Sequence, residues 1–290
     1  MSTQEPTICF VIPYFGRWPF WMPFFLASCQ ANPTVDWLLF SDCGELQELP
    51  PNVRIVQTSY EAYCVRVSVC LGIDFHPRNP YKLCDLKPAL GVIHEQELAG
   101  YEFWGFCDLD LVFGGLRDYY TADRLARKDV FSTHARRISG HCCLLRNTAE
   151  IRGLFQRVPN WRERLSDDVH HAFDEGPFSR LFIPHKNWPV FLWPLASWFR
   201  RAEFIEAFST PGAKIGWVDA SRDFPSCWFW HKGRLTNDRD GQRHFPYFHF
   251  VVWKKNDWRD LPQLSPHYLQ ELAATERWVI DSRGFHPLDA

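Results

Sequence analysis

The sequence predicts an α/β fold in which helices flank a mostly parallel β-sheet. Short apolar segments alternate with segments of helical character through the first 135 residues, as in βαβ units. No Gly/Ser-rich linker and no internal repeat interrupts the 290 residues. Beyond residue 135 the alternation weakens, and Trp, His and Pro become more frequent. We therefore expect one domain with an elaborated C-terminal half, divided into residues 1–135, 136–260 and a tail at 261–290.

The N-terminal half supplies most of the expected elements. Apolar runs at residues 7–13, 36–41 and 53–58 read as strands, and an Asn-Pro pair ends a helix predicted over residues 20–32. Two further helices are expected over residues 59–72 and 82–99. In a parallel sheet of this kind, ligands bind beyond the carboxyl ends of the strands. The segments that follow the first two strands are therefore candidate ligand sites.

The stretch YEFWGFCDLDLVFGG, residues 101–115, is the most informative one. Its apolar run, bounded by glycines, predicts a strand buried on both faces, and it carries Asp108 and Asp110 at positions i and i+2. Buried carboxylates need a cation or hydrogen-bond donors to compensate them. Divalent cations with oxygen ligands, completed by a substrate phosphate, are a common partner. A turn or a helix cap is the alternative for so short a motif.

The C-terminal half gives weaker signals. A strand is expected at residues 129–132, helices at 144–158 and 200–208, and short strands at 188–193, 228–230 and 247–253.

The composition limits the possible functions. Hydrophobic residues make up 46% and charged residues 23%, which is typical of a folded globular protein. Lys plus Arg number 32 against 34 Asp plus Glu, so no overall positive field recruits nucleic acid. Aromatic residues reach 17%, which suits a packed core and sites that stack sugars or bases. The ten cysteines include no CxxC pair, which predicts reduced thiols in a cytosolic protein rather than disulfides or a zinc site.

No secretory or membrane-spanning segment is expected. The start MSTQEP lacks basic residues, and the apolar ICFVIPYF that follows is short and contains proline. The apolar segment at residues 18–26 carries Pro19 and Pro23 and is expected to be a buried loop and helix start. Contact with a membrane interface is its alternative. The sequence thus predicts a cytoplasmic location, with membrane association as the alternative.

Several motifs in this order resemble a known class of enzymes. The segments VIPYFGR, YKLCDLKPALG, FWGFCDLDLVFG and ISGHCCLLRN together resemble nucleotide-sugar glycosyltransferases of the GT-A fold. More narrowly, they resemble a bacterial family of GT-A-like proteins with a DxD motif, associated with polysaccharide synthesis. The resemblance covers roughly residues 7 to 255. It implies a Rossmann-type sheet whose residues 1–135 bind a nucleotide and whose residues 136–260 contact the acceptor and close the metal site.

The resemblance implies a nucleotide-binding loop after the first strand, formed here by Pro13, Tyr14, Phe15 and Arg17. The aromatic rings suit a stacked base, and the guanidinium suits a phosphate. Asp42, after the second strand, matches a contact to the base or ribose. An ordinary strand-to-helix turn and an N-cap aspartate are the alternatives.

Further lysines are implied at the diphosphate. Lys82, Asp85 and Lys87 match the family pattern at a helix start, where an anion would offset the unfavourable position of the lysines. The alternative is that these are solvated helix residues. Lys254 or Lys255 would neutralise the leaving phosphates.

For the metal, the resemblance implies a third ligand from a C-terminal segment, and His249 in YFHFVVWKK is the candidate. His231 is a weaker rival. With Asp108 and Asp110, His249 would bind Mn²⁺ or Mg²⁺.

A base that activates the acceptor is implied for an inverting enzyme. Asp174 and Glu175 are the candidates, Asp167 and Asp168 the alternative pair, and a solvated turn is the other interpretation of either pair. The segment around Ser139–His141 is expected to shape the sugar site.

The resulting hypothesis is a metal-dependent glycosyltransferase of the hexosyltransferase type. It would transfer a sugar from a nucleoside-diphosphate sugar, with a UDP-sugar as the preferred candidate. The acceptor would be a saccharide or lipid-linked saccharide in bacterial surface polysaccharide synthesis. A sugar-phosphate nucleotidyltransferase is an alternative, but residues 14–16 lack the Gly-rich basic loop that it needs. A non-catalytic carbohydrate-binding protein is another, although it leaves Asp108, Asp110 and Lys87 unexplained.

Overall fold

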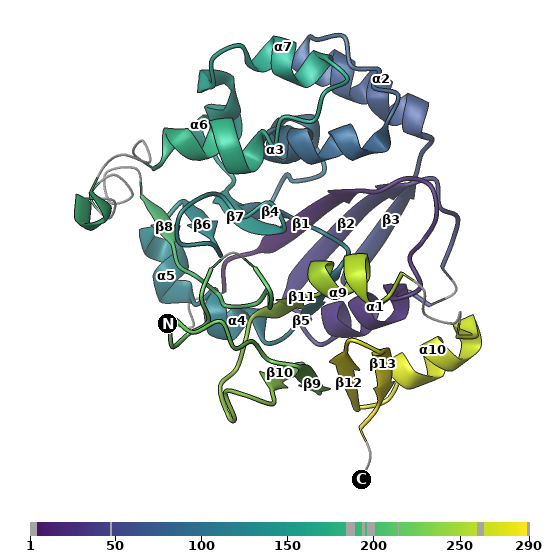
Figure 1. The fold of residues 1–290 in the computed structure, drawn as a ribbon. Helices are drawn as coiled ribbons and strands as arrows, with labels where there is room; N and C mark the ends of the chain where they lie inside the picture. Colours follow the sequence, from purple (N-terminus) through teal and green to yellow (C-terminus); the bar gives the residue numbers. More distant parts are fainter. Residues whose placement is uncertain are drawn as a thin grey trace.

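The structure is a computed structural model that describes residues 5–46, 48–183, 189–192, 195, 201–213, 215–259 and 264–288. Its centre is a seven-stranded sheet in the order β3-β2-β1-β4-β7-β6-β8 (Figure 1). Only β7 runs against its neighbours β4 and β6, while the other pairings are parallel. The sheet is therefore mostly parallel, as the sequence predicts. Its strands are β1 (Ile8–Pro13), β2 (Val35–Ser41), β3 (Val53–Gln57), β4 (Phe103–Cys107), β6 (Val130–Ser132), β7 (Cys142–Arg146) and β8 (Ala202–Phe204).

Helices cover both faces of this sheet. Figure 1 shows α2, α3, α6 and α7 above it and α1 below it. Alternate strand residues point to opposite faces, so Val11 packs in the upper core and Phe10 in the lower one. Helix α2 begins after the N-cap Ser59 and ends at Gly72, whose φ of 62° is left-handed. The helices are α1 (Met22–Gln30), α2 (Tyr60–Leu71), α3 (Leu90–Ile93), α4 (Leu116–Tyr119), α5 (Ala122–Arg127), α6 (Ala149–Arg152) and α7 (Trp161–Ser166).

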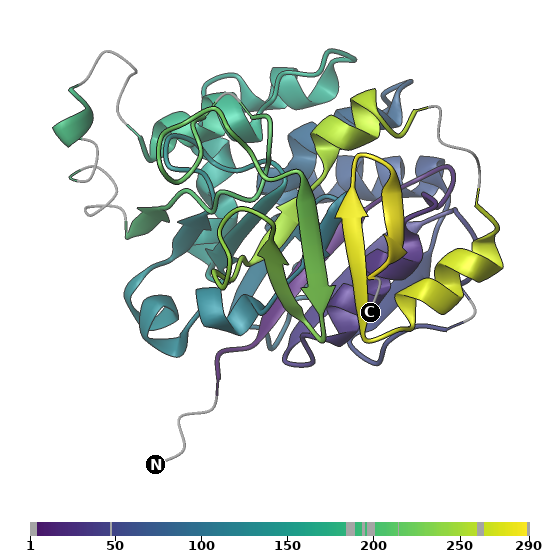
Figure 2. The same cartoon turned by 60° about the horizontal axis from the view of Figure 1, so that its bottom comes forward.

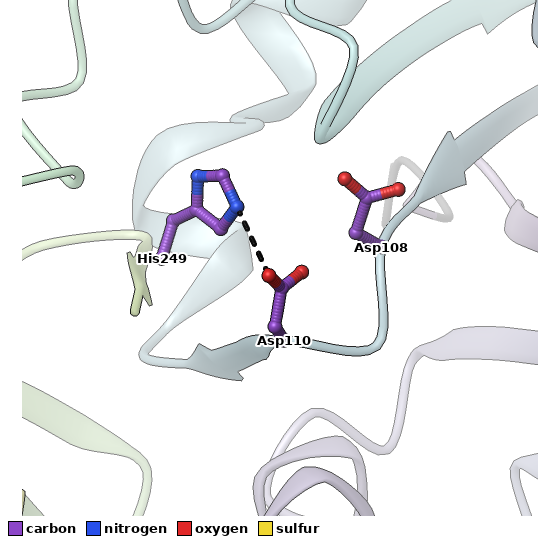
Figure 3. Close-up of side chains that lie close together, drawn as sticks. All are labelled: Asp108, Asp110 and His249. Atoms are coloured by element: carbon purple, nitrogen blue, oxygen red, sulfur yellow. Dashed lines mark ion pairs between the residues drawn. The ribbon is translucent and has the colours of Figure 1, made fainter. Parts of the chain in front are cut away.

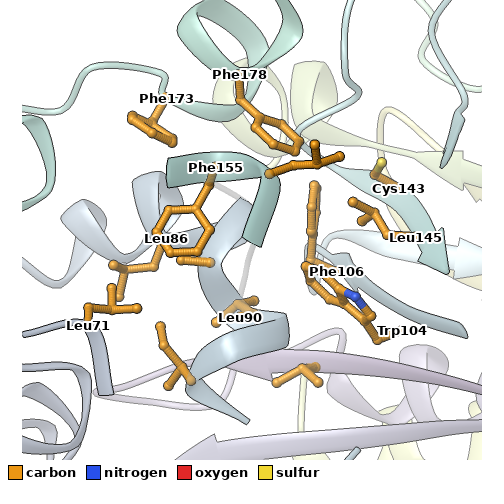
Figure 4. Close-up of a cluster of buried hydrophobic side chains, with 14 of the residues drawn as sticks. Leu71, Leu86, Leu90, Trp104, Phe106, Cys143, Leu145, Phe155, Phe173 and Phe178 are labelled. Atoms are coloured by element: carbon orange, nitrogen blue, oxygen red, sulfur yellow. The ribbon is translucent and has the colours of Figure 1, made fainter. Parts of the chain in front are cut away.

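The prediction of one long helix over residues 82–99 is wrong. A 3₁₀ helix, η1 (Pro80–Ala89), precedes the short α3. Buried residues recur in η1 with the three-residue period of a 3₁₀ helix, and Pro88 removes a backbone donor. Figure 4 shows Leu86 from η1 and Leu90 from α3 in the buried cluster that also contains Trp104 of β4. The tighter geometry places both Lys82 and Asp85 on the buried side.

Two expected helices in the C-terminal half are also corrected. Residues 144–158 begin in β7, and only then follow α6 and the 3₁₀ helix η2 (Gly153–Arg157). Because CCLLR is buried from Cys142 to Leu145, it shows no period that separates a strand from a helix. In the range 200–208, residues 202–204 form β8, which pairs with β6. In the range 188–193, residues 190–192 form the 3₁₀ helix η5 (Val190–Leu192), while residues 188 and 193 lie outside the described part.

The expected strand over residues 101–115 divides in two. β4 ends at Cys107, and β5 (Leu111–Phe113) leaves the central sheet to pair antiparallel with β11 (Tyr247–His249). The predicted strand at residues 247–253 is accordingly shorter, and helix α9 (Val251–Asn256) follows it. The acidic motif occupies the bend between β4 and β5.

A second sheet in the order β10-β9-β12-β13 packs against α1 and the β5–β11 pair, below the central sheet (Figure 2). The stacked rings of Trp230 and Trp278, 4.6 Å apart, lie in an aromatic cluster that also holds Phe24 of α1. In the described part of the chain, no helix is long and apolar enough to cross a membrane. The elements of this layer are β9 (Cys227–His231), β10 (Arg234–Asn237), β12 (Arg277–Asp281), β13 (Gly284–Pro287) and α10 (Pro266–Ala273).

Candidate active site

The bend between β4 and β5 is fixed by neighbours from three directions. The indole of Trp21 donates to the carbonyl oxygen of Leu109 (2.9 Å), and the backbone N–H of Asp108 donates to the carbonyl oxygen of His141 (3.0 Å). The β5–β11 ladder sets His249 opposite Leu111. The sheet register thus brings a C-terminal histidine to the acidic motif.

Asp108, Asp110 and His249 converge as predicted (Figure 3). One possible ligand atom from each lies within 4.8 Å of the other two. His249 Nε2 is 3.5 Å from Asp110 Oδ2, and His249 Nδ1 hydrogen-bonds with the hydroxyl of Thr210 (3.2 Å). Within the described residues, the buried Nε2 atom has no hydrogen-bond partner. Two carboxylates and an imidazole nitrogen aimed at one point fit Mn²⁺, which accepts both oxygen and nitrogen ligands.

Two lysines contact the same carboxylates. Lys87 Nζ lies 2.5 Å from Asp108 Oδ1, and Lys254 Nζ lies 2.7 Å from Asp110 Oδ2. Burial opposes ionisation of Asp110, but His249 and Lys254 outweigh it and hold the pKa of its carboxyl well below its usual range. Burial likewise lowers the pKa of Lys87, but Asp108 reverses this effect and the net shift is upward. Asp110 is therefore ionised and Lys87 protonated at neutral pH.

Polar side chains hold the ring of His249 through a chain of contacts. The ring of His249 stacks on that of His141, with centroids 4.2 Å apart. His141 Nε2 hydrogen-bonds with the hydroxyl of Tyr247 (2.8 Å), which donates to Thr133 Oγ1 (2.6 Å). Burial lowers the pKa of His141 well below its usual value, so this ring is neutral. Sequence reasoning placed His141 in the sugar site and missed Thr210 and Tyr247, because only the tertiary contacts connect them to His249.

Asp174 and Glu175 begin a π-helical turn, η3 (Asp174–Phe178), close to this centre. A Cβ atom at Gly140 would lie 2.8 Å from Asp174 Oδ2 and 3.0 Å from Glu175 Oε1. The carbonyl oxygen of Gly140 accepts a hydrogen bond from Lys87 (2.6 Å), so both acids adjoin the Asp108 side. Glu175 pairs with Arg137 (2.9 Å). Burial raises the pKa of Asp174 to about 7, although Lys87 opposes the shift.

Lys82 and Asp85 lie in a buried network instead of facing the Asp108 centre. The ammonium of Lys82 contacts the carbonyl oxygens of Arg164 (2.7 Å) and Val169 (2.5 Å) and the carboxylate of Asp167 (2.8 Å). It also lies 3.1 Å from Asp85 Oδ2. These contacts occupy its three donors, so the expected contact with a diphosphate is not available to it. We correct the interpretation accordingly: this pair anchors the segment from 164 to 173.

Asp167 and Asp168, the alternative candidates for the base, make contacts with neighbouring residues in the same region. Asp167 contacts Lys82 and also His171 Nε2 (2.6 Å). Asp168 accepts a hydrogen bond from the backbone N–H of Arg78 (3.1 Å).

The loops after β1 and β2 contact each other near the acidic bend. Asp42 accepts a hydrogen bond from the backbone N–H of Gly16 (2.7 Å), and the φ of Gly16 is 109°, a value that favours glycine. The ring of Tyr14 stacks on Trp18 with centroids 5.8 Å apart. Burial raises the pKa of Tyr14, and Asp110 contributes to the shift, so the two side chains interact electrostatically.

The rest of that loop divides between core and surface. Pro13 ends β1, and Phe15 packs inward against Tyr60 and Tyr63 (centroids 5.4 and 5.3 Å away). Arg17 is exposed. The rival His231 lies at the end of β9, opposite Arg277 of β12.

A cavity of about 1010 Å³ lies outside the candidate site, between α1, residues 45–46 and 48–51, and α10. Its lining is mostly apolar and includes Trp18, but none of Asp108, Asp110 and His249.

The sheet order, the single reversed strand and the acidic bend after β4 give the GT-A-like fold that the sequence resemblance implies. The chain belongs to the family described as "Family of unknown function (DUF6625)", whose model matches residues 10–267. No curated protein matches the sequence.

Several solved structures of glycosyltransferases are similar. Mouse xyloside xylosyltransferase 1 in its apo form is 10% identical, with a TM-score of 0.45 over 85% of this chain and 97% of that one. The galactosyltransferase LgtC with donor and acceptor sugar analogs is 9% identical, with a TM-score of 0.35 over 58% and 71%. The glycosyltransferase GlyE of Streptococcus pneumoniae TIGR4 is 12% identical, with a TM-score of 0.34 over 59% and 42%.

Proposed function

We propose that the protein is a metal-dependent glycosyltransferase that transfers a hexose from a nucleoside-diphosphate sugar to a saccharide acceptor. A UDP-sugar is the preferred candidate for the donor. The convergence of Asp108, Asp110 and His249 carries this proposal. The buried carboxylate of Asp110, the half-buried carboxylate of Asp108 and a buried imidazole nitrogen without a hydrogen-bond partner are costly to bring together unless a ligand uses them.

Asp108, Asp110 and His249 would hold Mn²⁺ or Mg²⁺. When bound, such an ion supplies Lewis acidity to the departing diphosphate. Lys87 and Lys254 neutralise the negative charge that develops on the same phosphates. Tyr14 and the loop held by Asp42 orient the nucleotide.

Asp174 takes the proton of the acceptor hydroxyl in an inverting reaction. As that oxygen attacks the anomeric carbon, the bond from this carbon to the diphosphate oxygen breaks, and the nucleoside diphosphate leaves with the electron pair. A carboxylate whose pKa is about 7 is well matched to general-base catalysis at neutral pH. Glu175 is the second candidate, but its pair with Arg137 competes for the carboxylate.

The biological setting that we propose is bacterial surface polysaccharide synthesis in the cytoplasm, with a free or lipid-linked saccharide as acceptor. The sequence resemblance supports this setting. Peripheral membrane contact through residues 18–26 receives less support, because Met22, Phe24, Phe25 and Leu26 are buried.

The experiment is calorimetry and thermal unfolding with UDP and Mn²⁺, separately and together. We expect strong stabilisation only by the combination, because phosphate oxygens complete the metal's coordination. Asp110→Asn should lose this linked binding and keep its fold, while Asp123→Asn on α5 should behave as wild type. Unchanged metal-dependent UDP affinity in Asp110→Asn would refute the metal site. Saccharide binding without any UDP–Mn²⁺ binding would indicate the carbohydrate-binding alternative.

A further inference from the structure

Tyr81 and His170 form an exposed aromatic pair beside the candidate site. The Tyr81 residue is 59% exposed, although it belongs to a helix whose neighbouring residues are buried. Its ring meets that of His170 edge-on, with centroids 4.7 Å apart and an angle of 62° between the planes. An exposed pair of rings offers a face on which the ring of a ligand can stack.

The pair contacts the buried network of Lys82 and Asp85, which anchors residues 164–173. Asp85, which is fully buried, lies 3.2 Å from His170 Nδ1 and accepts hydrogen bonds from the backbone N–H groups of His171 and Phe173 (2.9 Å each). On the other side, the side chain of Asn79 caps the backbone N–H of Tyr81 (3.0 Å). These contacts hold the His170 ring and the Tyr81 backbone in place before a ligand binds, which lowers the ordering cost of binding.

The pair also lies near the groups assigned to the reaction. His170 is four residues before Asp174, and Tyr81 is six residues before Lys87. Burial is the largest cause that raises the pKa of Tyr81, and the carboxylates of Asp108 and Asp174 add to the shift. The phenol is therefore within electrostatic reach of both the metal-binding side and the base.

We propose that Tyr81 and His170 form the platform that binds the acceptor sugar. The apolar C–H face of a pyranose ring would stack on Tyr81, with the reacting hydroxyl turned toward Asp174. This assignment rests on the proposed function.

The groups around the pair suit an uncharged ligand that carries hydroxyl groups. Asp168, two residues before His170, pairs with Arg78 at 3.9 Å, and Lys87 opposes the effect of the carboxylates on the pKa of Tyr81, so charges of both signs are present. A sugar hydroxyl can donate a hydrogen bond to such carboxylates. The proposed nucleotide loop, by contrast, lies at the ends of β1 and β2 around Tyr14 and Asp42.

The test compares Tyr81→Ala, Tyr81→Phe and the matched control Tyr268→Ala, which removes an exposed tyrosine from α10. Saturation-transfer NMR would follow the methyl glycosides of glucose, galactose, mannose and N-acetylglucosamine, and lactose, each with UDP and Mg²⁺ present. Calorimetry would follow UDP with Mn²⁺ for every variant.

We expect Tyr81→Ala to weaken saccharide binding roughly fivefold or more, as the loss of one aromatic contact predicts. Tyr81→Phe, Tyr268→Ala and the UDP–Mn²⁺ affinity of all variants should stay close to wild type. Equal saccharide binding in Tyr81→Ala, or no saccharide contact in the wild type across the whole set, overturns the platform. Lost UDP binding in Tyr81→Ala assigns the ring to the nucleotide instead.

The two proposals fail in different ways. If the wild type binds no UDP with Mn²⁺ but its saccharide binding depends on Tyr81, the glycosyltransferase proposal fails and the platform remains. If UDP–Mn²⁺ binding is intact and saccharide binding ignores Tyr81, only the platform fails.

Discussion

The buried environment of Asp174 strongly shifts the pKa of its carboxyl group. It is 4% exposed, and burial raises its pKa from 3.8 to about 7 against the opposing charge of Lys87. At pH 7 about half of this group is ionised, so it can both accept and release a proton. An exposed Asp would be a weaker base under the same conditions.

The transfer rate should therefore depend on pH. Because Asp174 must be ionised to accept a proton, kcat should rise from pH 5 to pH 8 with a midpoint near 7. Asp174→Asn should lower kcat about 10²–10⁴-fold, remove this dependence and leave UDP–Mn²⁺ affinity near normal. Rate profiles of both proteins, with Glu175→Gln in parallel, provide the check. A full loss in Glu175→Gln alone would move the role to the neighbouring residue.

Stability should change with pH in the opposite direction. A carboxyl whose pKa is raised by folding stabilises the folded state below its unfolded pKa, and this contribution is lost as pH rises through about 7. Between pH 4 and pH 7, Asp174→Asn should gain stability relative to wild type by up to about 1.4 kcal/mol per pH unit. Urea titrations at several pH values measure this difference. A constant difference would mean that Asp174 keeps an ordinary pKa.

Among the structural elements, the β5–β11 ladder depends on a close backbone approach. A Cβ atom at Gly114 would lie 2.2 Å from the carbonyl oxygen of Phe245. The same glycine donates its backbone N–H to the carbonyl oxygen of Pro246 (2.9 Å). This ladder brings His249 to the acidic bend, so a change in its spacing would also change the proposed metal site.

Gly114→Ala should force the two strands apart. We expect a loss of about 1–3 kcal/mol in the free energy of unfolding, together with weaker UDP–Mn²⁺ binding in the protein that remains folded. Gly153→Ala is the matched control, because no atom lies within 4 Å of its added Cβ. Urea denaturation and calorimetry give the two quantities. Wild-type metal binding in Gly114→Ala would show that the site tolerates a shifted β11.

The buried pair in η1 should behave as a structural element. Lys82→Met leaves the carboxylate of Asp85 buried without its cation, which typically costs about 3–5 kcal/mol. Hydrogen exchange at His171 and Phe173 should accelerate, because Asp85 then holds their backbone N–H groups less firmly. UDP–Mn²⁺ affinity of the folded protein should not change. A large drop in that affinity would restore Lys82 to the nucleotide site.

The elements that the sequence predicts well are those with local signals. Ser59 and Gly72 bound α2 through their own side-chain and backbone chemistry, and the alternation around them indicates a parallel sheet. The sequence does not predict the 3₁₀ helix η1, because the burial of Lys82 and Asp85 depends on partners more than 80 residues away. It does not predict β7, because a short apolar run has no period that distinguishes a strand from a helix.

The same division applies to the candidate site. Asp108 and Asp110 stand out in the sequence because two acids interrupt an apolar run. The place of His249 was expected from the family pattern alone, and the contacts of Thr210 and His141 have no local signature.

At the scale of the whole molecule, the C-terminal layer is joined to the central domain by aromatic packing. Phe24 of α1 stacks on Phe285 of β13 with centroids 3.9 Å apart and meets Trp278 of β12 at 5.1 Å. The same cluster includes Val112 of β5, next to the acidic bend. These contacts predict that the layer and the sheet unfold together.

Trp278→Ala should lower the free energy of unfolding by about 3–5 kcal/mol and shift the whole transition. The denaturation midpoints from near-UV and far-UV circular dichroism should still coincide. Tyr268→Ala, on the exposed side of α10, should change stability far less. Two separate transitions in Trp278→Ala would mean that the C-terminal layer unfolds as its own unit.

The ladder between β5 and β11 also orders events during synthesis. The acidic bend leaves the ribosome roughly 140 residues before the strand that carries His249, a delay of roughly 7–30 seconds at about 5–20 residues per second. Throughout that interval Asp110 lacks both its histidine and Lys254. A chain still in translation can therefore build much of its central sheet before β11 exists, and the proposed metal site is complete only once β11 has been made.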